Sequence, residues 1–194
     1  EKQVDVLIIG AGISGIGLAV HLSKNCPQRK FEILERRESF GGTWDLFRYP
    51  GIRSDSDMST FGFNFKPWAK DKVLASGAEI KGYLSDVISE NQLKDKIHFG
   101  HRVLSANYDS TKKKWLVEIE DSNNKKQTWS ANFVMGCTGY YNYDQGYAPQ
   151  FPEQDKFKGQ FIHPQHWPEN LDYTGKKVVI VGSGATAITL VPSM

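Results

Sequence analysis

Apolar residues follow a strand, helix, strand order at the start of the chain. VDVLIIG at 4–10 is a short apolar run rich in β-branched residues, which is typical of a buried parallel strand. Apolar positions at helical spacing predict a helix over 13–25, and FEILE at 31–35 predicts a second strand. A similar strand and helix recur at 176–182 and 185–191. Two α/β units are therefore predicted, rather than a short tandem repeat.

The middle of the chain predicts a long loop, a helix and a group of strands. Residues 38–68 are rich in Gly, aromatic residues, Pro, Asp and Ser, which predicts a long structured loop with one short helix. Helical spacing at 78–91 predicts a longer helix. Strands are expected near 97–108, at 114–120 and over 129–139, and the polar turns between them predict a small antiparallel meander beside the parallel sheet.

Composition agrees with an ordinary globular protein. The chain has 194 residues, of which 39% are hydrophobic and 24% charged. Its net charge of +2 is too small to indicate nucleic acid or an anionic membrane surface as a partner, and no apolar run approaches the roughly 18 residues of a membrane span. The N-terminus enters a strand directly, so no signal or transit peptide is expected. Cys26 and Cys137 form no CxxC pair, so reduced cysteines, a cytoplasmic location and interior packing of Cys137 are expected.

The turn after the first strand carries the pattern GxGxxG at Gly10, Gly12 and Gly15. Such a turn needs the first glycine for its sharp bend, the second for close approach of a pyrophosphate to the backbone, and the third for close packing of helix on strand. Glu35 ends the second strand 20 positions after Gly15, at the spacing expected for an acidic residue that binds ribose hydroxyls. Because a carboxylate repels a 2′-phosphate, the site is predicted to hold FAD or NAD rather than NADP. The alternative is a glycine-rich turn with a solvated glutamate.

The loop GGTWDLFRYPGIRSD, which follows, offers a second group of ligand-binding side chains. Gly42 permits close approach of a ligand, Thr43 brings a hydroxyl and Trp44 brings a flat apolar wall. The loop also holds two opposite charges in one turn, Arg53 and Asp55. The alternative is an aromatic-rich surface loop with a Ser or Asp helix cap near Met58. Composition alone leaves both interpretations open.

This loop resembles the second fingerprint of the Baeyer–Villiger monooxygenases, which reads A/G-G-x-W, four residues, F/Y-P-G/M, three residues, D. The residues that match are Gly41, Gly42, Trp44, Tyr49, Pro50, Gly51 and Asp55. VMGCTGYY at 134–141 is similar to the family's ATG-like segment, in which a strand end passes close to the flavin, with Cys137 where Ala is usual. The run 44–68 looks most like the subgroup that includes the ethionamide-activating enzyme. The resemblance implies that Asp55 is the active-site aspartate, which orients an essential arginine from a later segment.

FKGQFIHPQHWP lies in a connector rich in proline and aromatic residues. It fits the family's pattern FxGxxxHxxxW followed by Pro or Asp, and the matching residues are Phe157, Gly159, His163, Trp167 and Pro168. The related flavin-containing monooxygenases carry Phe or Tyr where Trp167 stands, so the resemblance points to the Baeyer–Villiger branch of the class B flavoprotein monooxygenases. His163 and His166 have no carboxylate or cysteine nearby in the sequence to complete a ligand set, so no metal site is expected. His163 is expected instead to couple domain position to cofactor state.

A second turn carries GxGxxA at Gly182, Gly184 and Ala187, where alanine is an accepted third residue. It resembles the family's NADPH site. The residue that separates NADP from NAD is expected about 20 positions later, beyond Met194, so the choice between NADPH and NADH stays open. The chain is expected to end inside its second domain, without the closing part of the FAD domain.

Together these patterns predict an α/β protein with a Rossmann-like FAD-binding domain at 1–150, a linker at 151–173 and the start of a Rossmann-like NADP-binding domain at 174–194. The resemblance implies a monooxygenase that uses FAD, NADPH and O2 to convert ketones to esters or to oxidise sulfur through a peroxyflavin. The alternatives are an N- or S-oxygenating flavin-containing monooxygenase and a non-catalytic flavin-binding fragment. The residues expected at FAD or NADPH are Gly10, Gly12, Ser14, Gly15, Glu35, Arg36, Gly42, Thr43, Trp44, Arg53, Asp55, Val103, Thr138, Gly139, Gly182, Gly184, Ala185, Thr186 and Ala187.

Overall fold

The computed structural model describes residues 2–194, and the chain forms two compact units. Unit 1 consists of Glu1–Gly42 and Lys81–Gly139. Unit 2 consists of Thr43–Ile80 and Tyr140–Met194. Each unit is therefore built from two separate stretches of the chain, so residues far apart in the sequence meet inside it.

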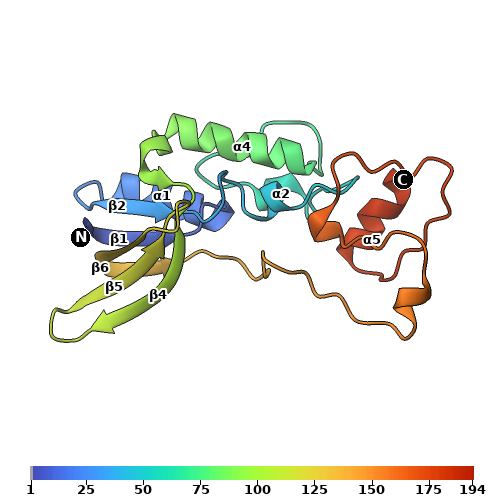
Figure 1. Ribbon diagram of the computed structural model, residues 1–194. Coiled ribbons are helices and arrows are strands. Elements are labelled where there is room, and N and C mark those ends of the chain that lie inside the picture. Colours follow the sequence, from blue (N-terminus) through green and yellow to red (C-terminus); the bar gives the residue numbers. More distant parts are fainter. Residues whose placement is uncertain (1) are drawn as a thin grey trace. The chain divides into compact units, whose positions relative to one another are not determined.

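Unit 1 contains one mixed sheet of six strands in the order β3-β2-β1-β6-β5-β4 (Figure 1). The strands are β1 (Lys2–Ile9), β2 (Phe31–Leu34), β3 (Ile97–His98), β4 (Arg102–Asp109), β5 (Lys114–Glu120) and β6 (Lys126–Gly136). β1 pairs in parallel with β2 and β6, and β2 pairs in parallel with β3. β5 pairs antiparallel with β4 and β6. The predicted α/β fold, a parallel sheet with a small antiparallel meander, is confirmed, and β6 belongs to both parts.

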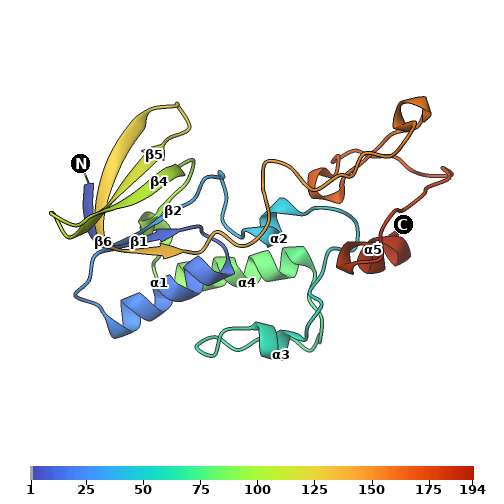
Figure 2. The ribbon, with the colours of Figure 1, turned by 90° about the horizontal axis from the view of Figure 1, so that it is seen from below.

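Two helices cover one side of the parallel strands. α1 (Ile13–Asn25) and α4 (Gly77–Glu90) lie on that side, while β4 and β5 extend on the other (Figure 2). α1 buries Ile16, Ala19 and Val20, which follow helical spacing along one face. A short 3-10 helix, η1 (Lys94–Lys96), leads into β3.

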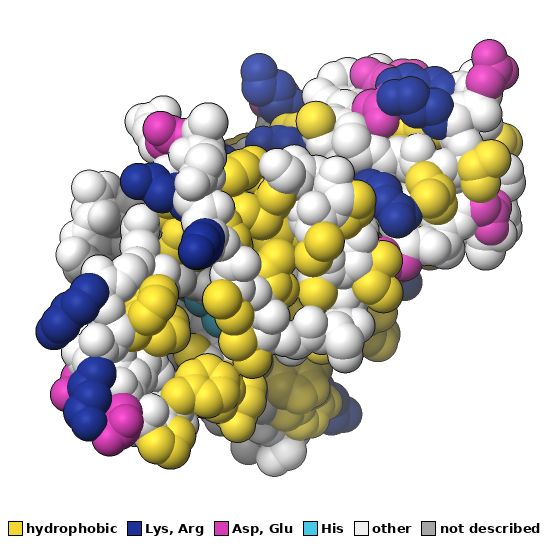
Figure 3. Space-filling view, turned by 90° about the vertical axis from the view of Figure 1, so that its right-hand side faces the viewer, with side chains coloured by type: hydrophobic (Ala, Val, Ile, Leu, Met, Phe, Trp, Pro, Cys, Tyr) yellow, Lys and Arg dark blue, Asp and Glu magenta, His cyan; other side chains and the backbone are white. Residues whose placement is uncertain are grey.

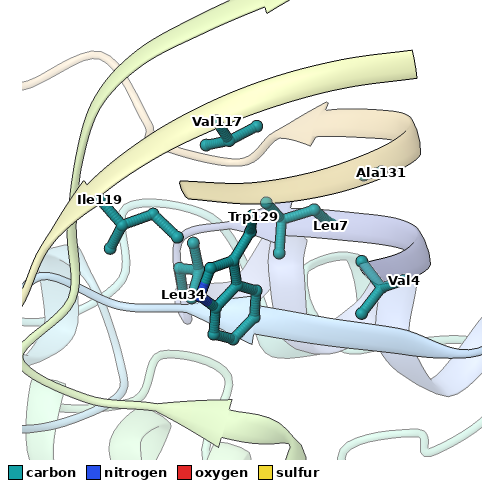
Figure 4. Close-up of a cluster of buried hydrophobic side chains, with 7 residues drawn as sticks. All are labelled: Val4, Leu7, Leu34, Val117, Ile119, Trp129 and Ala131. Atoms are coloured by element: carbon teal, nitrogen blue, oxygen red, sulfur yellow. The ribbon is translucent and has the colours of Figure 1, made fainter. Parts of the chain in front are cut away.

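One hydrophobic cluster of unit 1 lies between the parallel strands and the meander. Trp129 of β6 lies close to Leu7 and Leu34 of the parallel strands, and Val117 and Ile119 of β5 complete the contact (Figure 4). The remaining members of the cluster are Val4 and Ala131. Burial of these side chains, at about 25 cal/mol per Å² of apolar surface, holds the meander against the strands that carry the glycine turn.

Two predictions for unit 1 need correction. The strand expected near 97–108 is two strands, because Gly100 takes a left-handed φ of 64° and interrupts the extended backbone. The amide of Gly100 donates to the carbonyl of Arg37 at 3.1 Å, which fixes the turn. Cys137 is only half-buried, since it follows the last residue of β6, and burial nevertheless raises the pKa of its thiol.

Unit 2 consists mainly of loops and short helices. These are α2 (Thr43–Leu46), α3 (Met58–Phe61), η2 (Gln154–Lys156), η3 (Pro164–His166), α5 (Ala185–Leu190) and η4 (Val191–Ser193). The long loop at 38–68 therefore holds two short helices, where one was predicted. The helix cap expected near Met58 is present, because the carboxylate of Asp57 accepts from the amide of Thr60 at 2.9 Å. This bond lowers the pKa of Asp57.

The buried strand predicted at 176–182 is wrong. The segment is extended but pairs with no strand in the part of the chain that the structure describes. Val178 and Val181 are exposed, and Val179 keeps 85% of its surface exposed. An extended segment becomes a strand only when a neighbour accepts its backbone hydrogen bonds, and periodicity alone does not supply that neighbour. Figure 3 shows that hydrophobic side chains are present on the surface of the protein.

Helix α4 starts at a capping box whose strength depends on pH. The Oε2 atom of Glu79 accepts from the amide and the hydroxyl of Ser76 at 3.0 and 2.9 Å, and Lys72 Nζ lies 3.0 Å from Oε1. These bonds, the Ser76 amide first, lower the pKa of Glu79 from 4.5 to about 2. A lowered folded-state pKa stabilises the folded form above 4.5, and this stabilisation is lost as the pH falls towards 2.

We therefore expect the urea midpoint of the wild-type protein to fall more steeply between pH 4.5 and about 2 than that of Glu79→Gln. The amide side chain keeps an acceptor for Ser76 but does not titrate. Urea unfolding at a series of pH values, followed by circular dichroism, measures the difference. Parallel pH profiles for the two proteins would show that the capping box does not contribute to acid sensitivity.

Candidate cofactor site

The turn at the carboxyl end of β1 accepts only glycine at two positions. Gly10 has a φ of 107°, and a Cβ there would lie 2.4 Å from the carbonyl oxygen of Cys137. A Cβ on Gly15 would lie 1.9 Å from the carbonyl oxygen of Gly10, so α1 contacts the turn directly. The roles that the sequence assigned to the first and third glycines, a sharp bend and close helix packing, are both seen in these distances.

Helix α1 presents backbone donors at its first turn. Gly12 is the N-cap, and within the described residues no side chain caps the helix and no acidic residue stands in its first turn. Amides at the start of a helix are good anion donors, and the helix dipole adds a partial positive charge. Gly42 lies beside this turn, because a Cβ on Gly12 would be 3.7 Å from its Cα. The amide of Gly41 donates to the carbonyl of Ala11 at 2.9 Å and ties the second loop to the first.

Glu35 is buried at the end of β2, with 4% of its surface exposed. Its Oε2 accepts from the amide of Ala11 at 2.8 Å, and its Oε1 accepts from the amide of Arg37 at 2.9 Å. The carboxylate therefore holds the glycine turn in place through the amide of Ala11, and it is also a candidate ligand for the cofactor. Each carboxylate oxygen can accept a second hydrogen bond, so this contact leaves acceptor capacity for ribose hydroxyls.

The end of β6 reaches the same turn. The amide of Cys137 donates to the carbonyl of Ile9 at 2.8 Å, and the exposed Thr138 and Gly139 follow. The structure thus brings together Gly10, Gly12, Gly15, Glu35, Gly42 and Thr138 at the carboxyl ends of the parallel strands. That edge of an open parallel sheet is where such folds bind ligands.

Three further residues predicted for unit 1 lie on its neighbouring elements. Ser14 is exposed in the first turn of α1, and Arg36 is exposed directly after Glu35. Val103 lies in β4, and its half-buried side chain contacts the core cluster around Trp129.

In unit 2, Arg53 and Asp55 lie in a turn that hydrogen bonds hold in place. Ser54 is buried between Arg53 and Asp55, and its hydroxyl accepts from the amide of Ala75 at 3.1 Å. Nη1 of Arg53 donates to the carbonyl of Ser54 at 3.2 Å, and Asp55 is exposed. The turn therefore holds the carboxylate of Asp55 at the surface on a fixed backbone.

Two other residues of the predicted site, Thr43 and Trp44, belong to α2. Trp44 contacts Phe61 edge to face, with ring centroids 5.6 Å apart, and packs against the buried Met58. Thr43 is the first residue of the helix and is half-buried. Trp44 is therefore fixed by packing, as a rigid apolar wall would have to be.

Tyr141 is a residue that motif analysis did not select. Its pKa is raised to about 12, first by partial burial and then by Tyr140 and by the charges of Tyr49 and Asp55. Its ring contacts Phe47 at 5.0 Å between centroids. The phenol of Tyr141 therefore loses its proton only at a higher pH than an ordinary tyrosine.

The linker fingerprint has structural contacts. His163 Nδ1 accepts from the amide of Gln165 at 3.2 Å and caps η3, and the ring lies against Gly146. The buried Gln165 donates to the carbonyl of Asn142 at 2.7 Å. Trp167 packs against the buried cluster of Leu46, Phe47, Tyr49 and Leu190.

The aromatic residues at the start of this linker are exposed. The rings of Phe157 and Phe161 contact each other at 5.0 Å between centroids, and Gly159 lies against the ring of Phe157. Among residues 2–194 no group of three or more His, Cys, Asp or Glu side chains is arranged to hold a metal ion.

The second glycine motif is open to solvent. Gly182 has a φ of 132°, Gly184 is the N-cap of α5, and both are exposed. A Cβ on either glycine would meet nothing within 4 Å among the described residues. Ala185 is exposed, and Thr186 and Ala187 are half-buried in α5. Unlike the first motif, this one makes no close contact that requires glycine at these two positions.

Unit 2 also contains an open cavity of about 480 Å³. Its lining consists of Tyr173, Thr174, Gly175, Lys176, Val178, Ile180, Val191 and Met194. None of these residues was selected from the sequence. In the part of the chain described, no helix combines the length and the apolar character needed to cross a membrane.

The fold and the glycine turn define a nucleotide-binding α/β protein, and the family follows from comparison. The chain matches the flavin-binding monooxygenase-like family over residues 2–193 and belongs to that family. It is 96% identical over 194 residues to the probable FAD-binding monooxygenase AlmA of Acinetobacter sp, and 55% identical over 193 residues to the FAD-containing monooxygenase EthA of Mycolicibacterium smegmatis. All of this chain is covered in both comparisons, but it spans only 39% of the length of either relative.

Solved structures agree with this assignment. The chain resembles cyclohexanone monooxygenase bound to ε-caprolactone, with a TM-score of 0.85 and 28% identity over 100% of this chain and 38% of the other. It also resembles a steroid monooxygenase bound to NADP, with a TM-score of 0.83 and 30% identity over 98% of this chain and 36% of the other. These neighbours are Baeyer–Villiger monooxygenases, so the resemblance predicted from the fingerprints is confirmed.

Proposed function

We propose that the chain is the FAD-binding part of an NADPH- and O2-dependent monooxygenase that converts ketones to esters or oxidises sulfur. One observation carries the proposal: the uncapped first turn of α1, the glycine turn before it and the buried Glu35 meet at one edge of the sheet. That edge offers amide donors for a pyrophosphate and a carboxylate for ribose. The relatives named FAD-binding and FAD-containing monooxygenases support the choice of FAD.

The residues of unit 1 fit FAD in specific ways. Gly12 and the first-turn amides of α1 would hold the pyrophosphate, because no side chain among the described residues caps this helix. Glu35 would accept from the ribose hydroxyls while it keeps the turn in place through Ala11. Gly42 and Thr138 border the same turn from two other segments. When bound, FAD supplies the redox chemistry, since it accepts hydride from NADPH and activates O2.

The residues of unit 2 would line the cofactors: an apolar side chain would lie against FAD, and charged side chains would face NADP. Trp44 would form an apolar wall, and the proposal that Thr43 and Trp44 contact FAD rests on the fingerprint. Arg53 and Asp55 are proposed to face NADP, with Asp55 holding a cationic side chain by its exposed carboxylate. The second glycine motif is proposed to bind the pyrophosphate of NADPH, and the NADP-bound steroid monooxygenase supports this cofactor.

The domain limits 1–150, 151–173 and 174–194 are retained as part of the proposal. The linker role of 151–173, in which His163 couples domain position to cofactor state, is supported by its cap on η3 and its contact with Gly146. A ketone or sulfide and O2 are the proposed small-molecule partners.

The first test is the visible spectrum of the purified protein under anaerobic conditions, before and after NADPH is added. The expected result is a flavin band that NADPH bleaches and that NADH bleaches more slowly. No flavin band, even after reconstitution with FAD, would overturn the assignment of the glycine turn. A flavin band that neither nicotinamide bleaches would identify a flavin-binding fragment without hydride transfer.

The nearer rival is an N- or S-oxygenating monooxygenase, which Trp167 disfavours because the related enzymes carry Phe or Tyr there. Product analysis separates the two. Intact protein that is given a cyclic ketone with NADPH and O2 is expected to form the ring-expanded ester. Formation of a sulfoxide or N-oxide from suitable substrates, with no ester from any ketone, would favour the rival.

A further inference from the structure

Helix α5 is held by the middle of the fingerprint loop. The hydroxyls of Tyr49 and Thr189 are hydrogen-bonded at 3.3 Å in a buried contact, with 5% and 2% of these residues exposed. Thr189 Oγ1 also donates to the carbonyl of Ala185 at 3.0 Å. A threonine hydroxyl has one proton and a carbonyl accepts only. When that proton is directed to Ala185, the phenol of Tyr49 is left to donate to Thr189.

Gly51 provides the second half of this contact. It has a φ of 80°, and a Cβ there would lie 2.3 Å from the carbonyl oxygen of Thr189 and 2.1 Å from Ser193 Oγ. The last turn of α5 therefore rests directly on the backbone of the loop. Leu190 completes the contact, because it is buried with Leu46 and Tyr49 in one hydrophobic cluster.

Helix α5 depends on tertiary contacts for its position. The helix has only six residues, and helices this short are not stable without tertiary contacts. Among the described residues, the segment at 176–182 that leads into it pairs with no strand, and a Cβ on Gly182 or Gly184 would meet nothing within 4 Å. The contacts with Tyr49 and Gly51, together with the hydrophobic cluster around Leu190, therefore fix where the second glycine motif lies within unit 2.

We infer that Tyr49 and Gly51 are positioning residues for the nicotinamide cofactor. They hold α5 in place through Thr189, and through α5 they fix where the second glycine motif lies within unit 2. This inference rests on the proposed function, in which that motif binds NADPH. It assigns the Tyr-Pro-Gly of the fingerprint a role in holding a helix rather than in touching flavin or substrate.

The test is Tyr49→Phe in the intact FAD-loaded protein, with NADP⁺ affinity measured by equilibrium titration. Removal of one buried hydrogen bond is expected to weaken NADP⁺ binding about five- to tenfold, with an unchanged ratio of FAD to protein. KM for NADPH is expected to rise while kcat at saturating NADPH changes little. Thr189→Val is expected to weaken NADP⁺ binding by the same factor, whereas Thr189→Ser, which keeps the hydroxyl, is expected to bind NADP⁺ as the wild type does. The Tyr49→Phe/Thr189→Val double variant is expected to bind NADP⁺ no more weakly than either single variant.

Tyr147→Phe is the matched control, because it makes the same chemical change at a tyrosine with 87% of its surface exposed. It is expected to leave NADP⁺ affinity unchanged. Hydrogen exchange at the amides of 186–190, measured without NADP⁺, gives a readout independent of the cofactor, and it is expected to speed up in Tyr49→Phe but not in Tyr147→Phe.

The outcomes separate this inference from the proposed function. Normal NADP⁺ affinity in Tyr49→Phe overturns the positioning role, whatever happens to the amides of α5. Unchanged amide exchange in Tyr49→Phe would show that Tyr49 does not hold α5 in place. If the wild-type protein binds no NADP⁺, the proposed function fails and the cofactor role of Tyr49 fails with it, while the exchange experiment still decides whether the loop seats α5.

Discussion

Replacing Gly15 with alanine is expected to abolish FAD binding and to destabilise unit 1. The added Cβ would lie 1.9 Å from the carbonyl oxygen of Gly10, a distance that no contact can sustain, and the two nearest atoms are backbone. Helix α1 must therefore move off β1, which moves the first-turn amides away from the pyrophosphate position. Overpacking of this kind costs roughly 1–3 kcal/mol or more. Flavin absorbance per mole of purified protein and the midpoint of urea unfolding measure the two effects.

Gly82→Ala is the matched control for this prediction. Gly82 lies inside α4, where a Cβ would meet nothing within 4 Å. Glycine inside a helix is less favourable than alanine by roughly 0.5–1 kcal/mol, so this variant is expected to be slightly more stable and to bind FAD normally. If Gly15→Ala retained flavin at the wild-type level, the close packing of α1 against the turn would be refuted as the basis of the site.

The second large effect is expected at Glu35. In Glu35→Ala the buried amide of Ala11 loses its acceptor, and an unsatisfied buried donor costs roughly 1–3 kcal/mol. The variant also lacks the carboxylate proposed to accept from ribose. We therefore expect it to lose both folding stability and FAD affinity.

Glu35→Gln distinguishes these two losses. Its carbonyl oxygen can still accept from one of the amides of Ala11 and Arg37, while its side-chain amide cannot accept from the other. It is expected to recover part of the stability but to bind FAD at least tenfold more weakly than the wild type, which is about 1.4 kcal/mol. Urea unfolding of the apoprotein and FAD titration measure the two quantities separately. Full FAD affinity in both variants would leave Glu35 with a purely structural role.

The parts of this site that could be predicted from the sequence are those set by short stretches of chain. The glycine turn and its acidic partner follow fixed spacings, so the sequence alone predicts that Gly10 and Gly15 lie between β1 and α1 and that Glu35 lies at the end of β2. The burial of Glu35 under two backbone amides could not be foreseen, because spacing says which residue ends a strand but not which amides surround it.

The incorrect predictions depend on distant neighbours or on a single backbone angle. The segment at 176–182 has the composition of a strand, yet a strand requires a partner that composition does not identify. Gly100 divides a predicted strand because its φ is positive, a choice that glycine permits but does not require. The contact of Tyr49 with Thr189 joins residues 140 positions apart, and the fingerprint pattern contains no sign of it.

The position of β6 also determines when unit 1 can form during synthesis. β1 has β2 as an early neighbour, but its other edge pairs with β6, where Val4 lies opposite Ala131. During synthesis on the ribosome, one edge of β1 therefore stays unpaired until residues 43–80 and the strands β4, β5 and β6 have been made. Contacts between such distant residues make folding slow and leave the open edge available for wrong pairing. Nascent chains that stop before β6 are therefore expected to need chaperones that shield strand edges, and those that extend past Gly136 are expected to be released from them.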